Sequence, residues 1–247
     1  MLKYITLGVV QGLTEFLPVS SSAHLVIMQR ILGITGQELM LSIILHLGTT
    51  LALIIFFFKD ILKVLRNIKL LSYIIIVTII TGIVGILGKD FFTSLFSAPK
   101  LIAIALIFTG IILLLTKKFM QAKRTNLGIK DAFVLGFTQA VAIIPGISRS
   151  GITVSTLLFR KIDRETSFRF SFIASIPAVL GAALLEAKDI TFTYQADLKN
   201  FMIGFLFSLL SGIASLWLLK IILHKAKLYY FGYYCILLAI ITLLFIK

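Results

Sequence analysis

Long apolar stretches are the feature of this chain that most limits how it can fold. Six windows of about 20 residues, the length that an α-helix needs to cross a bilayer, follow one another along the sequence. They lie at 41–58, 70–88, 100–116, 166–186, 201–222 and 228–246. Hydrocarbon offers the backbone no hydrogen-bond partner, so segments of this length satisfy their own N–H and C=O groups as helices. We therefore predict an all-α, polytopic integral membrane protein with about six full transmembrane helices.

The composition agrees with one membrane domain. Hydrophobic residues make up 59% of the chain and the mean hydropathy is +1.08, well above the apolar share of soluble proteins. No charged linker long enough to separate two folded units interrupts the chain, so we expect a single membrane domain over 1–247. The first residues lack the small-residue cleavage site of a signal peptide, and we expect them to stay in the mature chain. The one cysteine, Cys235, lies in an apolar run and is expected to be an inert core residue.

Two polar stretches, at 1–33 and 130–160, depart from this apolar pattern. Each is about thirty residues long and has a proline, Pro18 or Pro145, and a serine cluster near its middle. A straight transmembrane helix should not be broken there. Irregular backbone at membrane depth is tolerated where protein buries it or where it lines a cavity. We predict that each stretch forms a re-entrant helical hairpin.

The basic residues indicate a topology. Fifteen of the 24 lysines and arginines lie in four stretches, at 59–69, 117–130, 160–164 and 220–227. Lysine and arginine in short loops mark the cytoplasmic side, so these stretches are predicted to lie inside. Three full spans separate the two hairpins, so the first should enter from outside and the second from inside. The net charge of +14 then follows from topology and from attraction to anionic headgroups, and we expect no nucleic-acid partner.

The two hairpins also resemble each other in sequence. Leu-Gly at 7–8 and Gln11 recur 128 residues later as Leu-Gly at 135–136 and Gln139, and the same offset aligns the serine clusters at 20–22 and 148–150. We predict an inverted repeat, with repeat 1 at about 1–116 and repeat 2 at about 130–247. Broken helices in inverted repeats meet near the bilayer midplane and can bind an anionic group. The serines could instead only pack helices together, but that alternative does not explain Glu15 or Arg149.

The first hairpin carries candidate catalytic groups. Gln11 and Glu15 are four residues apart and share a helix face, where their oxygens could converge on one cation or water. A helix restarting after Pro18 would place the serine cluster at 20–22 at its N-terminus, where free N–H groups and the helix dipole favour phosphate. His24 lies one helical turn beyond the first of these serines.

The second hairpin carries a candidate anion clamp. Gly146 and Gly151 allow close backbone approach, Ser148 and Ser150 supply hydroxyls, and Arg149 supplies a planar fork that suits phosphate oxygens. Together the two hairpins offer a nucleophile or bound water, an acid or base, a carboxylate for a metal and an anion clamp. This set is typical of phosphoryl transfer, here from a phosphorylated lipid.

From end to end the chain resembles the undecaprenyl-diphosphate phosphatase family, also called the bacitracin-resistance protein family. The family motif (Glu/Gln)-x-x-x-Glu followed by Phe-Leu-Pro-Val-Ser-Ser matches residues 11–21, and its Pro-Gly-x-Ser-Arg-Ser-Gly matches 145–151. The resemblance implies hydrolysis of undecaprenyl diphosphate to undecaprenyl phosphate and inorganic phosphate, which recycles the lipid carrier of peptidoglycan synthesis and confers bacitracin resistance. It further implies a bacterial plasma membrane, a site open to the outer face and a divalent cation, Mg²⁺ or Ca²⁺. Whether two chains form a homodimer stays open.

The family's functional positions can be placed on this sequence. The catalytic set comprises Glu15, Ser21 as the usual nucleophile, His24 and Arg149. The phosphate-binding set comprises Ser20, Ser22, Ser148, Ser150, Gly146 and Gly151, and the metal set comprises Gln11 and Glu15. Two positions depart from the common pattern, because many members have Glu in place of Gln11 and Gly in place of Ala23. With Gln11, we expect Glu15 alone to supply the anionic ligand or base.

Three questions stay open at this point: which group attacks phosphorus, which group takes the proton, and whether the protein is an enzyme or a transporter. Either Ser21 attacks phosphorus or it positions a water that attacks, and either His24 or Glu15 takes the proton. His46, in one of the apolar windows, is expected to make a contact between helices rather than to take part in catalysis. A lipid-phosphate flippase is the rival function, because inverted repeats with broken helices also build transporters.

Overall fold

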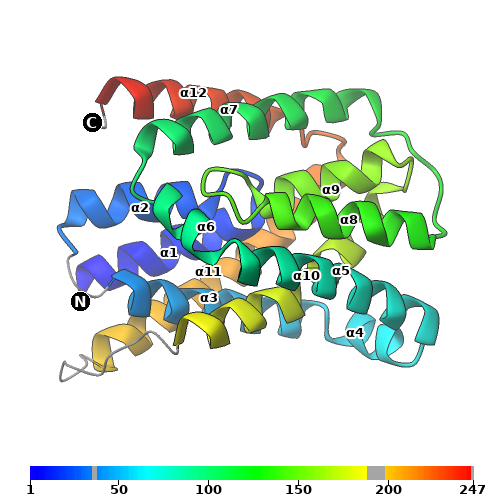
Figure 1. Cartoon of the computed structure of the whole chain (residues 1–247), viewed down its shortest axis with the longest axis horizontal. Helices are drawn as coiled ribbons and strands as arrows, with labels where there is room; N and C mark the ends of the chain where they lie inside the picture. The colour runs from blue at the N-terminus through cyan, green and yellow to red at the C-terminus, as the bar shows by residue number, and fades with distance from the viewer. Residues whose placement is uncertain (35–37, 188–197, 246–247) are drawn as a thin grey trace.

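The computed structural model describes residues 1–34, 38–187 and 198–245, and every named element in these ranges is a helix. Most helices lie along the long axis of one bundle (Figure 1). In the first half they are α1 (Leu2–Phe16), α2 (Ser21–Leu32), α3 (Glu38–Phe56), α4 (Phe58–Leu65), α5 (Ile68–Leu87), α6 (Lys89–Leu95) and α7 (Pro99–Leu115). In the second half they are α8 (Ile129–Val141), α9 (Arg149–Phe159), α10 (Arg164–Ala187), α11 (Leu198–His224) and α12 (Tyr230–Phe245). The all-α prediction is confirmed.

The predicted membrane spans correspond to helices of the bundle. Within the described ranges, five helices are long and apolar enough to cross a bilayer: α3, α5, α7 with its short continuation to Lys118, α10 and α11. The sixth predicted window contains α12, which is apolar but has only 16 residues. The chain is therefore a multi-pass membrane protein.

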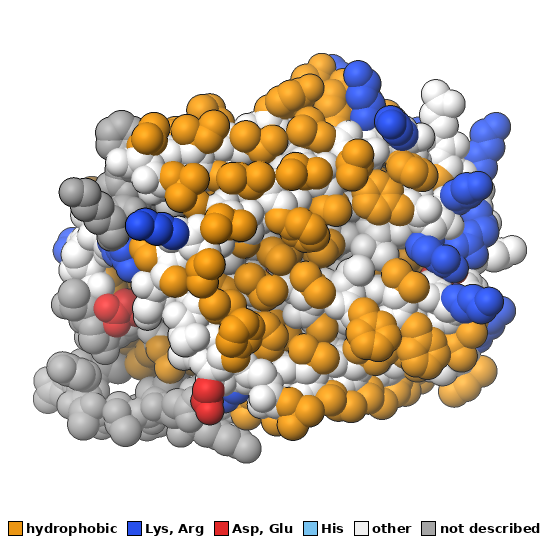
Figure 2. Space-filling model, turned by 45° about the horizontal axis from the view of Figure 1, so that its top comes forward, with side chains coloured by type: hydrophobic (Ala, Val, Ile, Leu, Met, Phe, Trp, Pro, Cys, Tyr) orange, Lys and Arg blue, Asp and Glu red, His pale blue; other side chains and the backbone are white. Residues whose placement is uncertain are grey.

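The outer surface of the bundle suits lipid. Ile75, Ile79 and Ile83 recur at one-turn spacing along α5, and each is about half exposed. Figure 2 shows apolar side chains over the middle of one face and lysines and arginines gathered mainly at one end. That basic end lies opposite the end where α1 starts and α12 finishes (Figure 1). The clustering of basic residues at one end agrees with the predicted topology.

An aromatic cluster fixes the end of α1 in the bundle. Phe16, the last residue of α1, packs edge-on against Phe172 of α10 with ring centroids 5.7 Å apart. Phe168 and Phe57 complete the cluster, and their centroids lie 5.2 Å apart. All four rings are buried. Because Phe16 directly follows Glu15, this packing also holds the carboxylate in place.

The broken helix pairs pack on long helices through glycine. Gly8 of α1 lies so close to α11 that a Cβ at this position would be 2.5 Å from the carbonyl oxygen of Gly204. Gly136 of α8 packs on α5, where a Cβ would be 2.9 Å from Cδ1 of Ile80. Small residues allow this close approach in membranes, where no hydrophobic driving force exists between helices. Gly8 and Gly136, which the predicted repeat aligns, thus each allow a helix of a broken pair to approach a long helix closely.

Candidate active site

The first hairpin breaks at the predicted proline. Leu17 leaves α1 in an extended conformation, Pro18 follows, and Ser20 caps the start of α2 with a φ of 67°. The Ser20 hydroxyl accepts a hydrogen bond from the Ala23 N–H at 3.4 Å. The side chain of Ser20 thus satisfies one of the free N–H groups at the start of α2.

The second hairpin breaks in a corresponding way. Ser148 caps α9, and its hydroxyl accepts a hydrogen bond from the Gly151 N–H at 3.2 Å. Gly146 has a φ of 96°, and a Cβ there would lie 2.4 Å from the carbonyl oxygen of Ile102. Only glycine fits this turn, because a side chain would meet both the left-handed strain and the α7 backbone.

The turns of the two hairpins touch each other. The Gly146 N–H donates a hydrogen bond to the Ser22 hydroxyl at 3.2 Å. The Ser150 hydroxyl donates to the Leu17 carbonyl at 3.3 Å. The predicted phosphate-binding serines therefore also join the hairpins, and this contact brings the N-termini of α2 and α9 together.

Glu15 is the centre of the polar cluster between the hairpins. Its carboxylate is nearly buried, with 8% of the residue exposed, and one oxygen, Oε1, pairs with the Arg149 guanidinium. The other oxygen, Oε2, accepts hydrogen bonds from the Ser21 hydroxyl at 2.7 Å and from the Gln11 amide at 3.0 Å. His46 of α3 is also close, with Nε2 3.5 Å from Oε2. The structure thus brings together three of the four predicted catalytic residues.

Two polar atoms beside this carboxylate lack partners within the described structure. They are Nη1 of Arg149 and Oε1 of Gln11, both buried. A buried polar atom without a hydrogen bond costs about 1–3 kcal/mol, more when it is charged. In the described residues this leaves one donor and one acceptor unmet on the two side chains that bond to Glu15, and a ligand that carries oxygens could satisfy the guanidinium donor.

The ring nitrogens of His24 contact groups other than Glu15. One ring nitrogen, Nδ1, is 2.8 Å from the Ser20 carbonyl oxygen, and Nε2 is 2.7 Å from the Tyr234 hydroxyl of α12. The two rings are nearly parallel, with centroids 5.8 Å apart. His24 therefore faces α12, and Tyr234 is a neighbour that the sequence motifs do not include.

His46 is the histidine that lies beside the Glu15 carboxylate. Its Nδ1 is 2.8 Å from the Ser42 carbonyl oxygen in its own helix, which leaves Nε2 to face Glu15 of α1. The contact between helices that the sequence suggests for His46 is thus made to the site itself. The signal that could have found it is the position of an ionisable residue within a transmembrane segment, which by default indicates function.

The oxygens at this point suit a hard cation. Glu15 supplies a carboxylate, and Gln11 supplies an amide oxygen that has no partner among the described residues. Within the described ranges, no group of three or more His, Cys, Asp or Glu side chains forms a complete metal cage. Mg²⁺ is commonly held by one or two carboxylates together with substrate phosphates, so this donor set fits a cation that binds with its substrate.

These observations define a class of protein: a multi-pass membrane protein in which two broken helix pairs bring a carboxylate, a hydroxyl and a guanidinium to one buried point. The chain belongs to the family described as bacitracin resistance protein BacA, whose family model matches residues 4–241.

Similar proteins cover almost the same length. A protein from Halothermothrix orenii named undecaprenyl-diphosphatase is 40% identical over 98% of this chain and 96% of its own length. A protein of the same name from Carboxydothermus hydrogenoformans is 41% identical, covering 97% and 95%. One from Methanobrevibacter smithii is 38% identical, covering 98% and 96%. These matches confirm the family that the sequence motifs indicated.

Proposed function

We propose that this protein is an undecaprenyl-diphosphate phosphatase that releases inorganic phosphate and returns undecaprenyl phosphate to peptidoglycan synthesis. One observation carries the proposal: Glu15 lies between the Ser21 hydroxyl and the Arg149 guanidinium, with an unpartnered guanidinium nitrogen beside it. The family and the names of its members support the choice of substrate. Hydrolysis of this carrier diphosphate would also confer resistance to bacitracin.

Ser21 is the proposed nucleophile. Its hydroxyl already donates to Glu15 Oε2 at 2.7 Å, so the carboxylate is placed to accept the proton as the serine oxygen bonds to the terminal phosphorus. The bond between that phosphorus and the bridging oxygen breaks, and undecaprenyl phosphate leaves. The departing undecaprenyl phosphate takes the serine proton from Glu15, which restores the carboxylate. Glu15 then accepts a proton from water as the water oxygen bonds to the phosphorus of the phosphoserine. The bond between that phosphorus and the Ser21 oxygen breaks, Glu15 returns the proton to this oxygen, and inorganic phosphate leaves.

The second hairpin stabilises the transferred phosphoryl group in this scheme. In the part of the chain that the structure describes, Nη1 of Arg149 has no partner while Nη2 holds Glu15, so one guanidinium can align the base and bind a phosphate oxygen. The N-termini of α2 and α9 add backbone N–H groups and positive dipole ends. Removing one such donor typically costs 10²–10³-fold in turnover.

A divalent cation, Mg²⁺ or Ca²⁺, would be held by Glu15 and the unpartnered oxygen of Gln11 together with diphosphate oxygens. Its chemistry when bound would be to neutralise negative charge on those oxygens. The buried Gln11 oxygen supports this assignment, since it faces no protein donor in the described residues.

The proposal includes a setting for the enzyme. The basic end of the bundle lies in the cytoplasm of a bacterium, and the site opens to the outer face of the plasma membrane. The two repeats, about 1–116 and 130–247, form one inverted pair: α1 packs on α11 as α8 packs on α5, and α7 packs on α12. One chain supplies both hairpins, so a homodimer would hold two complete sites.

The test is phosphate release from undecaprenyl diphosphate by purified protein in detergent, with and without Mg²⁺ or Ca²⁺. We expect cation-dependent release that falls by about 10²–10⁴-fold in Glu15→Gln, because the proton acceptor is lost. Glu38→Gln, at the start of α3, is the matched control and should stay active. A folded wild-type protein without release would instead favour lipid transport, and normal turnover in Glu15→Gln would refute the assignment of the base.

The nucleophile needs its own experiment. Brief reaction with substrate labelled in its terminal phosphate should leave label on Ser21, and Ser21→Ala should abolish both the label and turnover. Ser94→Ala, which removes an exposed hydroxyl on α6, is the control. Full activity in Ser21→Ala would show that water attacks phosphorus directly.

A further inference from the structure

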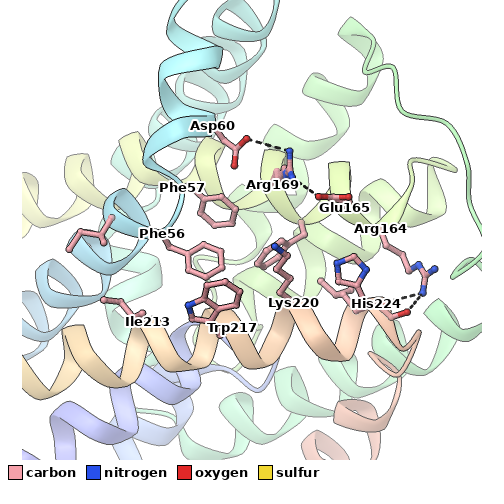
Figure 3. A pocket seen from close by; sticks show the side chains of 13 residues that line it. Phe56, Phe57, Asp60, Arg164, Glu165, Arg169, Ile213, Trp217, Lys220 and His224 are labelled. Atoms are coloured by element: carbon pink, nitrogen blue, oxygen red, sulfur yellow. Dashed lines mark hydrogen bonds and ion pairs between the residues drawn. The ribbon is translucent and has the colours of Figure 1, made fainter.

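A second polar pocket lies at the basic end of the bundle. It lies between the end of α3, the start of α4, the first turns of α10 and the last turns of α11, and its volume is about 320 Å³ (Figure 3). Four of its lining residues are aromatic: Phe56, Phe57, Phe168 and Trp217. Six more are charged or titratable: Asp60, Arg164, Glu165, Arg169, Lys220 and His224. None of these residues belongs to the site around Glu15.

The carboxylates of this pocket are paired with Arg169 and with Lys63, a residue of α4 outside the pocket lining. Arg169 donates to Asp60 at 3.3 Å and also pairs with Glu165, as the dashed lines in Figure 3 show. Asp60 is also 3.7 Å from Nζ of Lys63, so the two acidic groups of the pocket are matched by two cations, Arg169 and Lys63. The remaining cations of the pocket face no carboxylate of their own in the described structure.

Two permanent positive charges remain uncompensated. Arg164 donates through Nη1 to the carbonyls of Leu223 and His224, at 3.0 and 2.7 Å, where it caps α11. Lys220 lies over the Trp217 ring, with Nζ 5.4 Å from the centroid. Figure 3 shows Lys220 and His224 one turn apart on α11, with Arg164 next to His224. A carbonyl or a ring does not neutralise a cation, so the pocket attracts an anion.

We propose that this pocket binds the phosphate headgroup of an anionic glycerophospholipid, with Lys220 and Arg164 holding the phosphate. Basic pockets between transmembrane helices at the cytoplasmic side bind such headgroups. The aromatic residues favour a lipid over free phosphate, because a phosphate ion would not cover their exposed apolar surface. Trp217 is 55% exposed and lines the pocket together with the charged groups, so an acyl chain has apolar surface to contact there.

Trp217 makes the proposal directly measurable, since it is the only tryptophan of the chain. Its fluorescence in vesicles that contain phospholipids with brominated acyl chains reports which lipid lies beside the pocket. We expect brominated phosphatidylglycerol to be preferred over brominated phosphatidylcholine by about five-fold, the contribution of roughly one basic residue at a membrane surface. The Lys220→Glu variant should lose this preference.

Lys227→Glu is the matched control, because Lys227 also lies over an aromatic ring, that of Tyr230, but does not line the pocket. It should keep the preference for phosphatidylglycerol. Equal quenching by both lipids in the wild-type protein would overturn the proposal, as would an unchanged preference in Lys220→Glu. A preference that excess inorganic phosphate removes, and that sodium chloride of equal ionic strength does not, would assign the pocket to a free anion instead. Lys220→Gln, which adds no negative charge, covers the case in which the glutamate variant does not fold.

Discussion

The two hairpins share a scaffold but differ in chemistry. Both break before a serine that caps the next helix, Ser20 or Ser148, and both approach a long helix through glycine. Their glutamines correspond as well, since Gln11 and Gln139 are both buried with an amide oxygen that lacks a described partner. The first hairpin nevertheless holds a carboxylate and a hydroxyl, whereas the second holds a guanidinium.

Positions aligned by the 128-residue offset show where the two hairpins differ. Glu15 corresponds to Ile143, and Ser21, the first helical residue of α2, corresponds to Arg149, the first of α9. These two N-terminal residues bond to different oxygens of the same Glu15 carboxylate. The first hairpin thus carries the proposed nucleophile and base, and the second carries the charge proposed to bind the phosphate. Positions that set the backbone are alike, and positions that face the shared site are complementary.

Among the substitutions that test this division of roles between the hairpins, we expect the largest effect from one in the second hairpin. Arg149→Lys should lower turnover by about 10²–10³-fold, because a single ammonium group cannot hold Glu15 and a phosphate oxygen as a planar fork can. Phosphate release at saturating substrate measures the change. Arg169→Lys, whose arginine also bridges carboxylates but lies outside the site, should stay within a few-fold of wild type. Near-normal turnover in Arg149→Lys would show that the second hairpin contributes position and not chemistry.

Much of this architecture could be predicted from sequence, because apolar length, proline and serine clusters act locally. The windows at 41–58 and 70–88, for example, correspond closely to α3 and α5. Spacing along a helix also placed Gln11 beside Glu15, four residues on.

The contacts that a side chain makes with distant parts of the chain could not be predicted in the same way. His24 shares a helix face with Ser20, yet its ring turns to Tyr234, 210 residues further along the chain. His46 reaches Glu15 only because α3 packs beside α1. The spacing of residues along one helix predicts neither contact.

The backbone comparison can be sharpened by adding one methyl group to each hairpin. Gly8→Ala should destabilise the protein by about 1–3 kcal/mol, because the new Cβ would lie 2.5 Å from the backbone oxygen of Gly204. Gly136→Ala should cost less, since the nearest atom is the flexible end of Ile80. Thermal unfolding in detergent measures both. Gly82→Ala, whose Cβ would have no atom of the described residues within 4 Å beyond its own helix turn, is the control and should be neutral or slightly stabilising. An equal loss in Gly8→Ala and Gly136→Ala would mean that the two interfaces tolerate crowding alike.

The smallest effect is expected at the edge of the first hairpin, where Tyr234 holds His24. If His24 takes part in the reaction, Tyr234→Phe should lower turnover by about 2- to 10-fold, the contribution of one hydrogen bond, here 2.7 Å long. Tyr233→Phe, at the adjacent exposed tyrosine, is the matched control and should have no effect. A role through His24 predicts that Tyr234→Phe changes nothing further in a His24→Ala background. Additive losses in the double variant would instead show that Tyr234 acts on the substrate or on α12 directly, and the first hairpin would then need no support from outside its own repeat.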